Sequence, residues 1–279
     1  MQNALTIDLE DWYHAPNSTS RQPERWSTFE DRVVDSTHRL LAILEQEGVR
    51  ATFFVLGYIA DRFPDLVRLV ADAGHEIGLH GYYHRQVFRL TRDQFRAELL
   101  RGREAVESAG GQKVIGHRAP MFSINGTALW ALEELRDLGF QYDSSVFPTR
   151  NMLYSYPGAP RFAYHPLQAS DFVEFPMSTI RVAGVNVPVA GGFYLRFYPY
   201  QLTRWALSRL NRAGHPAIVY LHPWELDPGH PRPSLTLREQ FTHYYRLDRT
   251  AAKLGQLLHD FRFCTLADLC NQAVQRREG

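Results

Sequence analysis

The sequence ATFFVLGYIADRFPDLVRLVADAGHEIGLHGYYH, residues 51–84, predicts a strand, a helix and a second strand in short succession. Residues 51–56 are mostly β-branched or aromatic, which is typical of a buried strand. Pro64 favours the start of a helix and Gly74 favours its end, and residues 76–79 (EIGL) predict the next strand. This succession predicts two parallel strands that are joined by a crossover helix.

The same alternation continues in both directions along the chain. Residues 4–7 predict a strand, and apolar residues between Val33 and Leu44 recur at helical spacing. Thr91 and Gln94 form a capping-box pattern, which predicts the start of a further helix. Further strands are predicted at residues 113–115, 140–146, 217–221 and around Phe263. The alternation predicts an α/β fold, a distorted (β/α) barrel, whose functional side chains gather where the strands end.

Residues 148–192 interrupt this alternation, because they are rich in Pro, Gly, Tyr and Val and contain no amphipathic helix. We interpret them as an irregular and β-hairpin insertion, since they are too short and irregular to build a second core. We expect this insertion to line one side of the cleft within a single domain that spans residues 1–279.

The composition excludes several classes of protein. The chain has 31 Lys and Arg against 30 Asp and Glu, so no basic field attracts nucleic acid. Its two cysteines, Cys264 and Cys270, do not suggest a disulfide framework or a cysteine metal cage. Residues 1–10 lack the features of a signal peptide, and no apolar run is long enough for a transmembrane segment. We therefore expect a cytoplasmic protein.

Ionisable side chains follow several of the predicted strands. They are Asp8, Glu10 and Asp11 after residues 4–7, His80 and His84 after residues 76–79, Arg118 after residues 113–115, Asp143 within residues 140–146, and His222 after residues 217–221. Each has an ordinary structural explanation on its own, such as a helix cap or a surface arginine. Their common place at strand ends indicates a site, because the carboxyl ends of parallel strands meet at one rim.

The chemistry that fits this set is metal-assisted hydrolysis. Two neutral histidines and a carboxylate form a three-ligand site for a divalent metal with open positions. Such a metal polarises a carbonyl group and lowers the pKa of bound water. A second carboxylate can act as general base, a further histidine can protonate a leaving amine, and an arginine can keep the base ionised.

Five motifs can be compared with a known family. They are TIDLED at residues 6–11, HGYYH at 80–84, RAPMF at 118–122, YDSSVFP at 142–148 and LH at 221–222. Together they resemble the polysaccharide deacetylases of the NodB-homology type, carbohydrate esterase family four. The resemblance implies a barrel that often has seven strands. It also implies hydrolysis of N-acetyl groups on N-acetylhexosamine units with one divalent metal ion, Zn²⁺.

The resemblance also implies a role for each candidate residue. Asp8 is the base, His80 and His84 are metal ligands, His222 is the general acid, Arg118 orients Asp8, and Asp143 helps to set the electrostatics of the acid and base. A carboxylate such as Asp143 or Glu225 would favour the protonated form of His222. His14 and His117 lie near the rim without matching a ligand motif, and Trp224 is a candidate for stacking on a sugar ring.

The third metal ligand is either Asp11 or Glu10. The family's metal-binding Asp directly follows the base, but Leu9 occupies that position here. Along a straight strand Asp8 and Glu10 share a face, whereas a strand that ends at Asp8 could turn to bring in Asp11. Of the two, we prefer Asp11.

Three further segments narrow the resemblance to a subgroup. DLEDWYH at residues 8–14, VAGGFYLRFYPY at 189–200 and LHPWELD at 221–227 resemble deacetylases that are encoded beside exopolysaccharide and exosortase gene clusters. This implies an N-acetylated oligo- or polysaccharide, or its lipid-linked precursor, as substrate. It also implies the exopolysaccharide assembly machinery as partner, and a family-specific extension at residues 223–279.

Three alternative functions remain open at this stage. The first is an O-deacetylase, because the same chemistry attacks esters. The second is an allantoinase-like cyclic-amide hydrolase on the same fold, which the retention of His80 and His84 disfavours. The third is a carbohydrate-binding pseudoenzyme, which the presence of Asp8, Arg118 and His222 disfavours.

Overall fold

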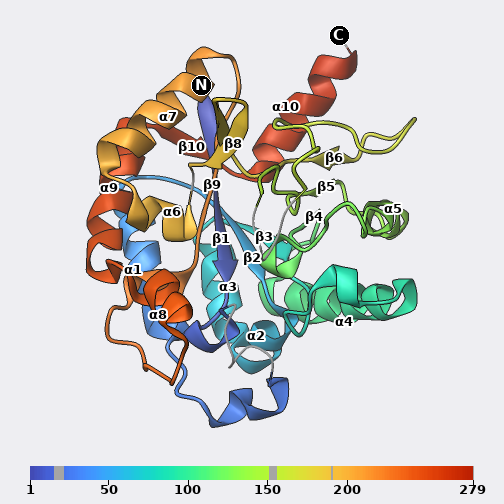
Figure 1. Ribbon diagram of the computed structural model, residues 1–279. Helices are drawn as coiled ribbons and strands as arrows, with labels where there is room; N and C mark the ends of the chain where they lie inside the picture. Colours follow the sequence, from blue (N-terminus) through green and yellow to red (C-terminus); the bar gives the residue numbers. More distant parts are fainter. Residues whose placement is uncertain (16–21, 151–155, 190, 279) are drawn as a thin grey trace.

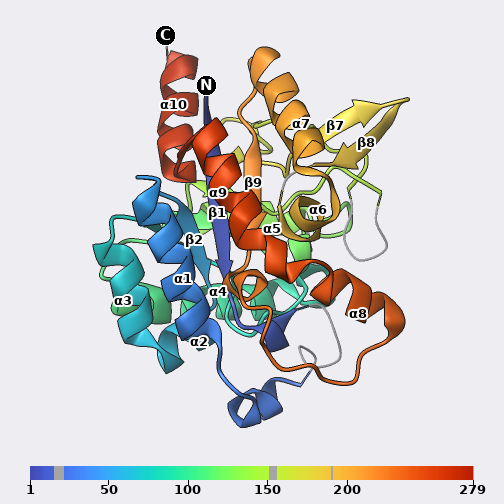
Figure 2. The ribbon, with the colours of Figure 1, turned by 90° about the vertical axis from the view of Figure 1, so that its left-hand side faces the viewer.

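The computed structural model describes residues 1–15, 22–150, 156–189 and 191–278, which form a curled parallel sheet surrounded by helices (Figures 1 and 2). The strands lie in the order β10-β1-β2-β3-β4-β5-β6, and β9 also pairs with β1. They are β1 (Gln2–Leu9), β2 (Thr52–Val55), β3 (Glu76–Leu79), β4 (Gly116–His117), β5 (Tyr142–Asp143), β6 (Val173–Glu174), β9 (Ile218–Leu221) and β10 (Arg262–Cys264). All of these pairings are parallel, so the α/β fold class is confirmed.

The sheet has eight strands in the part of the chain that the structure describes, one more than the resemblance implied. β1 is eight residues long and has three partners. Its residues 6–9 pair with β2, residues 4–7 pair with β9, and residues 2–4 pair with β10. A strand of this length can pair with two short strands along one edge, which explains the additional strand.

The two faces of β1 belong to different parts of the core. Leu5, Ile7 and Leu9 pack in the main hydrophobic cluster together with the helices. Ala4 belongs to a second cluster, inside the curled sheet, that includes Phe54 of β2. Since side chains alternate along a strand, the even-numbered positions of β1 point to the interior of the sheet.

Ten α-helices lie among the described residues. They are α1 (Val33–Gln46), α2 (Gly57–Arg62), α3 (Pro64–Asp72), α4 (Arg92–Gly110), α5 (Trp130–Asp137), α6 (Gly192–Phe197), α7 (Tyr200–Arg212), α8 (Leu237–Tyr244), α9 (Thr250–Asp260) and α10 (Leu266–Glu278). The capping box expected at Thr91 and Gln94 is present at the start of α4. Among the described helices, none has both the length and the apolar character that a membrane span requires.

The barrel is distorted because β6 and β9 do not pair with each other in the described residues. The backbone N–H of Ile218 in β9 instead donates to the Ser178 hydroxyl at 2.7 Å. Gly191 also passes against β9, with φ at 94° and a hypothetical Cβ only 1.9 Å from the Tyr220 carbonyl oxygen. Only glycine fits there, so this segment closes against β9 by contact rather than by a strand ladder.

Residues 148–192 contribute a strand to the main sheet in addition to the hairpin that we expected. The expected hairpin is present as β7 (Thr179–Val182) and β8 (Val185–Pro188). However, β6 pairs with β5 and extends the main sheet. Residues 151–155 and 190 of this segment lie outside the described residues. A two-residue strand such as β6 is too short to show a periodic pattern, which explains why the sequence did not predict it.

Two other expectations change in detail. The strand expected at residues 113–115 lies at Gly116–His117, where it pairs with β3 and β5. Residues 223–279 contain β10, which pairs with the first residues of β1. This C-terminal segment therefore contributes directly to the main sheet.

Candidate active site

Three buried side chains meet where β1 and β3 end. Glu10 follows β1, and His80 and His84 follow β3; one ligand atom of each lies within 4.8 Å of the others. The chain turns sharply after β3, with positive φ at Gly81 (73°) and at His84 (54°). This turn brings the ring of His84 to 5.3 Å from the ring of His80.

His80 is held in the form that a metal ligand requires. Its Nδ1 lies 2.8 Å from the carbonyl oxygen of Arg118, which can only accept a hydrogen bond. Nδ1 therefore carries the proton, and Nε2 keeps its lone pair. Burial lowers the pKa of His80 to about 4, so the ring is neutral at pH 7.

Glu10 supplies the negative charge of this group. Its Oε2 lies 2.9 Å from His84 Nε2, but the two atoms are not aligned as a hydrogen bond, and Oε2 has no other partner among the described residues. A buried carboxylate oxygen without a hydrogen bond is costly unless a cation satisfies it. Two imidazoles and one carboxylate are a donor set that suits Zn²⁺ and similar divalent metals, so these residues fit the expected ion.

Asp11 lies outside this group, so the structure favours Glu10 over the Asp11 that we preferred from the sequence. The Asp11 carboxylate accepts hydrogen bonds from the backbone N–H groups of Trp12 (2.7 Å), Arg32 (2.7 Å) and Val33 (2.8 Å). It thereby caps the 3₁₀ helix at Trp12–His14 and the start of α1. Because β1 stays extended through Leu9, alternation directs Glu10 to the interior alongside Asp8.

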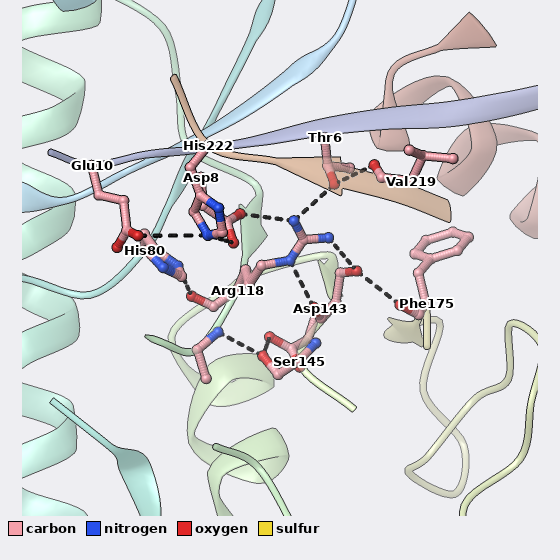
Figure 3. Close-up of polar contacts among 12 residues, drawn as sticks. Thr6, Asp8, Glu10, His80, Arg118, Asp143, Ser145, Phe175, Val219 and His222 are labelled. Atoms are coloured by element: carbon pink, nitrogen blue, oxygen red, sulfur yellow. Dashed lines mark hydrogen bonds and ion pairs between the residues drawn. The ribbon is translucent and has the colours of Figure 1, made fainter. Parts of the chain in front are cut away.

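Asp8 lies beside this group and is paired with a buried arginine (Figure 3). Arg118 Nη1 donates to Asp8 Oδ1 at 2.8 Å and to the Thr6 hydroxyl at 2.8 Å. Its Nε and Nη2 donate to the carbonyl and hydroxyl oxygens of Ser144 at 3.0 and 2.9 Å. These bonds fix Arg118, which in turn fixes one oxygen of Asp8 and leaves Oδ2 directed toward His222.

His222 follows β9 and faces both carboxylates. Its Nε2 lies 3.9 Å from Asp8 Oδ2 and 3.5 Å from Glu10 Oε1, and its Nδ1 lies 2.8 Å from Glu225 Oε1. Burial opposes protonation of His222, but the negative charges of Glu10 and Glu225 outweigh it and raise the pKa of His222 to about 9. The side chain is therefore a cation at neutral pH in the metal-free protein.

Glu225 is itself held by an arginine that the sequence did not reveal. Arg196 Nε donates to Glu225 Oε2 at 2.6 Å, and both side chains are buried. Burial would raise the pKa of Glu225, but Arg196 and then His222 lower it to about 2. The histidine and glutamate are three residues apart in HPWE, a recognisable capping pattern, whereas Arg196 lies far away in the sequence.

Asp143 is fully buried and bonds to His117 and Ser145. Its Oδ1 is 2.7 Å from His117 Nδ1 and accepts from the Ser145 hydroxyl at 2.7 Å. That hydroxyl oxygen accepts from the backbone N–H of Ala119, next to Arg118, at 2.7 Å. Asp143 is therefore linked through Ser145 to the loop that carries Arg118. From the sequence, either Asp143 or Glu225 could have been the carboxylate beside His222, and in the structure it is Glu225.

His14 and His117 both have structural partners. His14 Nδ1 accepts from the backbone N–H of Asp11 at 2.9 Å, and its ring packs edge-on against Trp26. His117 is completely buried and is paired with Asp143. Neither belongs to the group formed by Glu10 and the two histidines after β3.

Comparisons with protein-family models divide the chain into two parts. Residues 17–142 match the polysaccharide deacetylase family. Residues 144–271 match a domain of unknown function, DUF3473. Since β1 pairs with β2 from the first part and with β9 and β10 from the second, the two matched parts share one sheet.

Similar proteins were found among curated sequences and among solved structures. The chain is 31% identical over 128 residues to the peptidoglycan-N-acetylglucosamine deacetylase of Bacillus cereus, which is 45% of this chain and 46% of that protein. It is 32% identical over 108 residues to the peptidoglycan deacetylase of Helicobacter pylori, which is 39% and 36% of the two chains. The chain thus spans less than half the length of these relatives.

A crystal structure shows the same fold. A proposed polysaccharide deacetylase from Mycobacterium smegmatis matches with a TM-score of 0.67 and 23% identity, over 98% of this chain and 90% of that one. At this identity the likeness concerns the fold alone. It extends over both of the parts that the family models match.

Proposed function

We propose that the chain, whose residues 17–142 match the polysaccharide deacetylase family, removes N-acetyl groups from N-acetylhexosamine units in a metal-dependent hydrolysis. The observation that carries this proposal is that a metal-binding group and an acid–base pair of side chains lie next to each other. Glu10, His80 and His84 form a metal-binding group, and Asp8 and His222 lie beside it with Nε2 and Oδ2 3.9 Å apart.

In the proposed reaction, water adds to the acetyl carbonyl, the C–N bond breaks, and acetate and a free amine are formed. A divalent ion, Zn²⁺ by the donor set, would polarise the carbonyl and acidify the attacking water when bound by Glu10, His80 and His84. Asp8 accepts the proton of the water. Its Oδ1 is held by Arg118 at 2.8 Å, so Oδ2 is the oxygen that remains available.

His222 supplies a proton to the leaving nitrogen. Its Nδ1 is bound to Glu225, so Nε2 is the nitrogen that faces Asp8 and the substrate side of the site. The leaving nitrogen departs as a neutral amine only if it gains this proton as the C–N bond breaks. Glu225 and Arg196 orient the ring, and Asp143 supports the loop of Arg118 from behind.

We propose an N-acetylated polysaccharide or its lipid-linked precursor in exopolysaccharide biosynthesis as the substrate, in the cytoplasm and next to the assembly machinery. The resemblance of residues 189–200 and 221–227 to exopolysaccharide-associated deacetylases supports this proposal. The two relatives, a peptidoglycan-N-acetylglucosamine deacetylase and a peptidoglycan deacetylase, support the same chemical class. We treat residues 1–279 as one functional domain, since strands from both matched parts contribute to the site.

The test is acetate release from a panel of N-acetylhexosamine oligomers and lipid-linked precursors, with added zinc and with a chelator. Zinc-dependent release from an amide substrate is the expected result. Release from O-acetyl esters alone would indicate an O-deacetylase, and binding of oligomers without any release would indicate a pseudoenzyme. Either outcome would overturn the proposal.

A pair of variants tests the roles of the acid and the base. His222→Ala should lose on the order of 10²–10⁴ in turnover on the amide and keep its zinc. On an activated ester this loss should shrink, because a good leaving group needs little protonation, whereas the loss in Asp8→Asn should persist. His259→Ala, in an exposed part of α9, is the matched control. Equal recovery of both variants on the ester would contradict the assignment.

A further inference from the structure

One tryptophan contacts both the metal-binding group and the acid. Trp224 lies in the 3₁₀ turn after β9 and is 4% exposed. Its indole Nε1–H donates to Glu10 Oε1 at 3.3 Å. The other oxygen of the same carboxylate, Oε2, faces His84 Nε2 at 2.9 Å. Oε1 of Glu10 thus accepts from the indole and lies 3.5 Å from His222 Nε2, whereas Oε2 faces the metal-binding group.

The indole of Trp224 is itself held by two stacked imidazoles. The ring of His222 lies 5.2 Å from it at an interplanar angle of 19°. The ring of His243, in α8, lies 4.3 Å away at 10°. A buried indole that is stacked on two imidazoles cannot rotate without displacing one of them, so the direction of its N–H is set by the fold.

A glutamate ligand needs such a partner more than an aspartate does. Glutamate has one more rotatable bond, so fixing its side chain costs more conformational entropy than fixing the side chain of an aspartate. In this chain Glu10 lies at the third ligand position, where the resemblance led us to expect an aspartate. A hydrogen bond to one carboxylate oxygen orients the other oxygen and reduces the ordering that remains when the metal binds.

We propose that Trp224 is a positioning residue that holds Glu10 with Oε2 directed to the metal. The inference rests on the proposed metal site. All three proposed ligands precede residue 144, whereas Trp224 lies within the segment that matches DUF3473. That segment therefore completes the metal site as well as supplying the acid, which gives a physical reason for the two parts to occur together.

The experiment compares zinc affinity in Trp224→Phe and Trp205→Phe by competition with a chromogenic chelator. Phenylalanine keeps an aromatic ring that can stack on the two imidazoles but has no N–H. Trp205 lies on α7 and is 43% exposed, so its replacement is the matched control. Zinc should bind about 10–100-fold more weakly to Trp224→Phe, the usual effect of removing a hydrogen bond to a ligand, and unchanged to Trp205→Phe.

Two further readouts separate positioning from a general loss of structure. The metal-free Trp224→Phe variant should melt as one cooperative unit, and the visible spectrum of its Co²⁺ form should differ from the wild type because the carboxylate is no longer fixed. In the wild type, zinc should shift the ¹⁵N-indole signal of Trp224. Should Trp224→Phe fail to fold, this signal can be assigned by elimination with Trp→Phe changes at the other four tryptophans.

The outcomes distinguish this inference from the proposed function. Unchanged zinc affinity and an unchanged cobalt spectrum in folded Trp224→Phe would overturn the inference and leave the metal site in place. A ¹⁵N-indole signal of Trp224 that does not shift when zinc is added to the wild type would also overturn the inference. A wild-type protein that binds no divalent metal would overturn both.

Discussion

Replacing Asp11 by alanine should damage the fold and spare the metal site. The Asp11 carboxylate accepts three backbone hydrogen bonds at 2.7–2.8 Å, two of them from the start of α1. A hydrogen bond to a charged group contributes about 1.5–3 kcal/mol, and losses within one cluster are not additive. We therefore expect Asp11→Ala to lower the free energy of unfolding by about 3–5 kcal/mol, which corresponds to roughly 5–9 °C in Tm for a chain of this size.

The pH of this measurement matters. Burial raises the pKa of Asp11 to about 7, so ionisation of its carboxyl above that pH costs the folded protein free energy and offsets part of these hydrogen bonds. Thermal unfolding of the metal-free protein should therefore be followed at pH 5.5 and at pH 8.5, and the loss in Asp11→Ala should be the smaller one at pH 8.5. Asp11→Asn keeps one carbonyl oxygen, which can still accept from Trp12 or from the start of α1, so its loss should be about half as large.

Zinc binding should depend on the neighbouring residue, Glu10, and not on Asp11. Glu10→Gln should fold with nearly unchanged Tm but lose zinc in step with His80→Ala and His84→Ala, because it removes the charge of the metal-binding group. Folded Asp11→Asn should bind zinc with wild-type stoichiometry. The reasoning fails if Asp11→Asn loses zinc while Glu10→Gln keeps it.

Three further predictions concern the surroundings of the site. Arg118→Lys should keep zinc but lose about 10²-fold in turnover, because one ammonium group cannot reproduce four hydrogen bonds; a parallel loss of zinc would contradict this. In the metal-free protein the pKa of His222 is raised to about 9, so the protonated ring should add about 3 kcal/mol to the free energy of unfolding. This contribution is fully present below pH ~6.5 and is lost as the pH rises through 9. The free energies of unfolding of the wild type and of His222→Gln, measured in urea, should therefore converge at pH 9.5. A difference between them that does not change with pH would refute the raised pKa. Gly191→Ala should lower Tm by several degrees, because its Cβ would lie 1.9 Å from the Tyr220 carbonyl oxygen, whereas Gly255→Ala, with nothing within 4 Å, should not lower it.

The sequence predicted the parts of the fold that depend on long periodic segments. The strand at Ala51–Leu56, the helix from Pro64 and the capping box at Thr91 are all present, because apolar periodicity and caps act locally. The two-residue strands β4 and β6 were misplaced or missed. Their positions depend on neighbouring strands, and two residues carry no pattern of their own.

The candidate residues show the same division between local and distant causes. The sequence located the strand ends that carry Asp8, His80 and His222, and the structure brings these side chains to one rim (Figure 3). It did not separate Glu10 from Asp11, because this depends on whether β1 stays extended for one more residue. Arg196 was missed because its partner, Glu225, is joined to it only through the folded chain.

The central position of β1 has a consequence for the order in which the molecule assembles. β1 pairs with β2 and, across more than 200 residues of intervening chain, with β9. The entropy of closing that longer loop costs about 1 kcal/mol more than closing the loop to β2, and long-range pairings of this kind slow folding. A chain released or stalled before β9 forms would hold all three proposed metal ligands but neither Trp224 nor His222. On the proposed function, the acid and the tryptophan beside Glu10 would then join the metal-binding residues only when β9 pairs with β1.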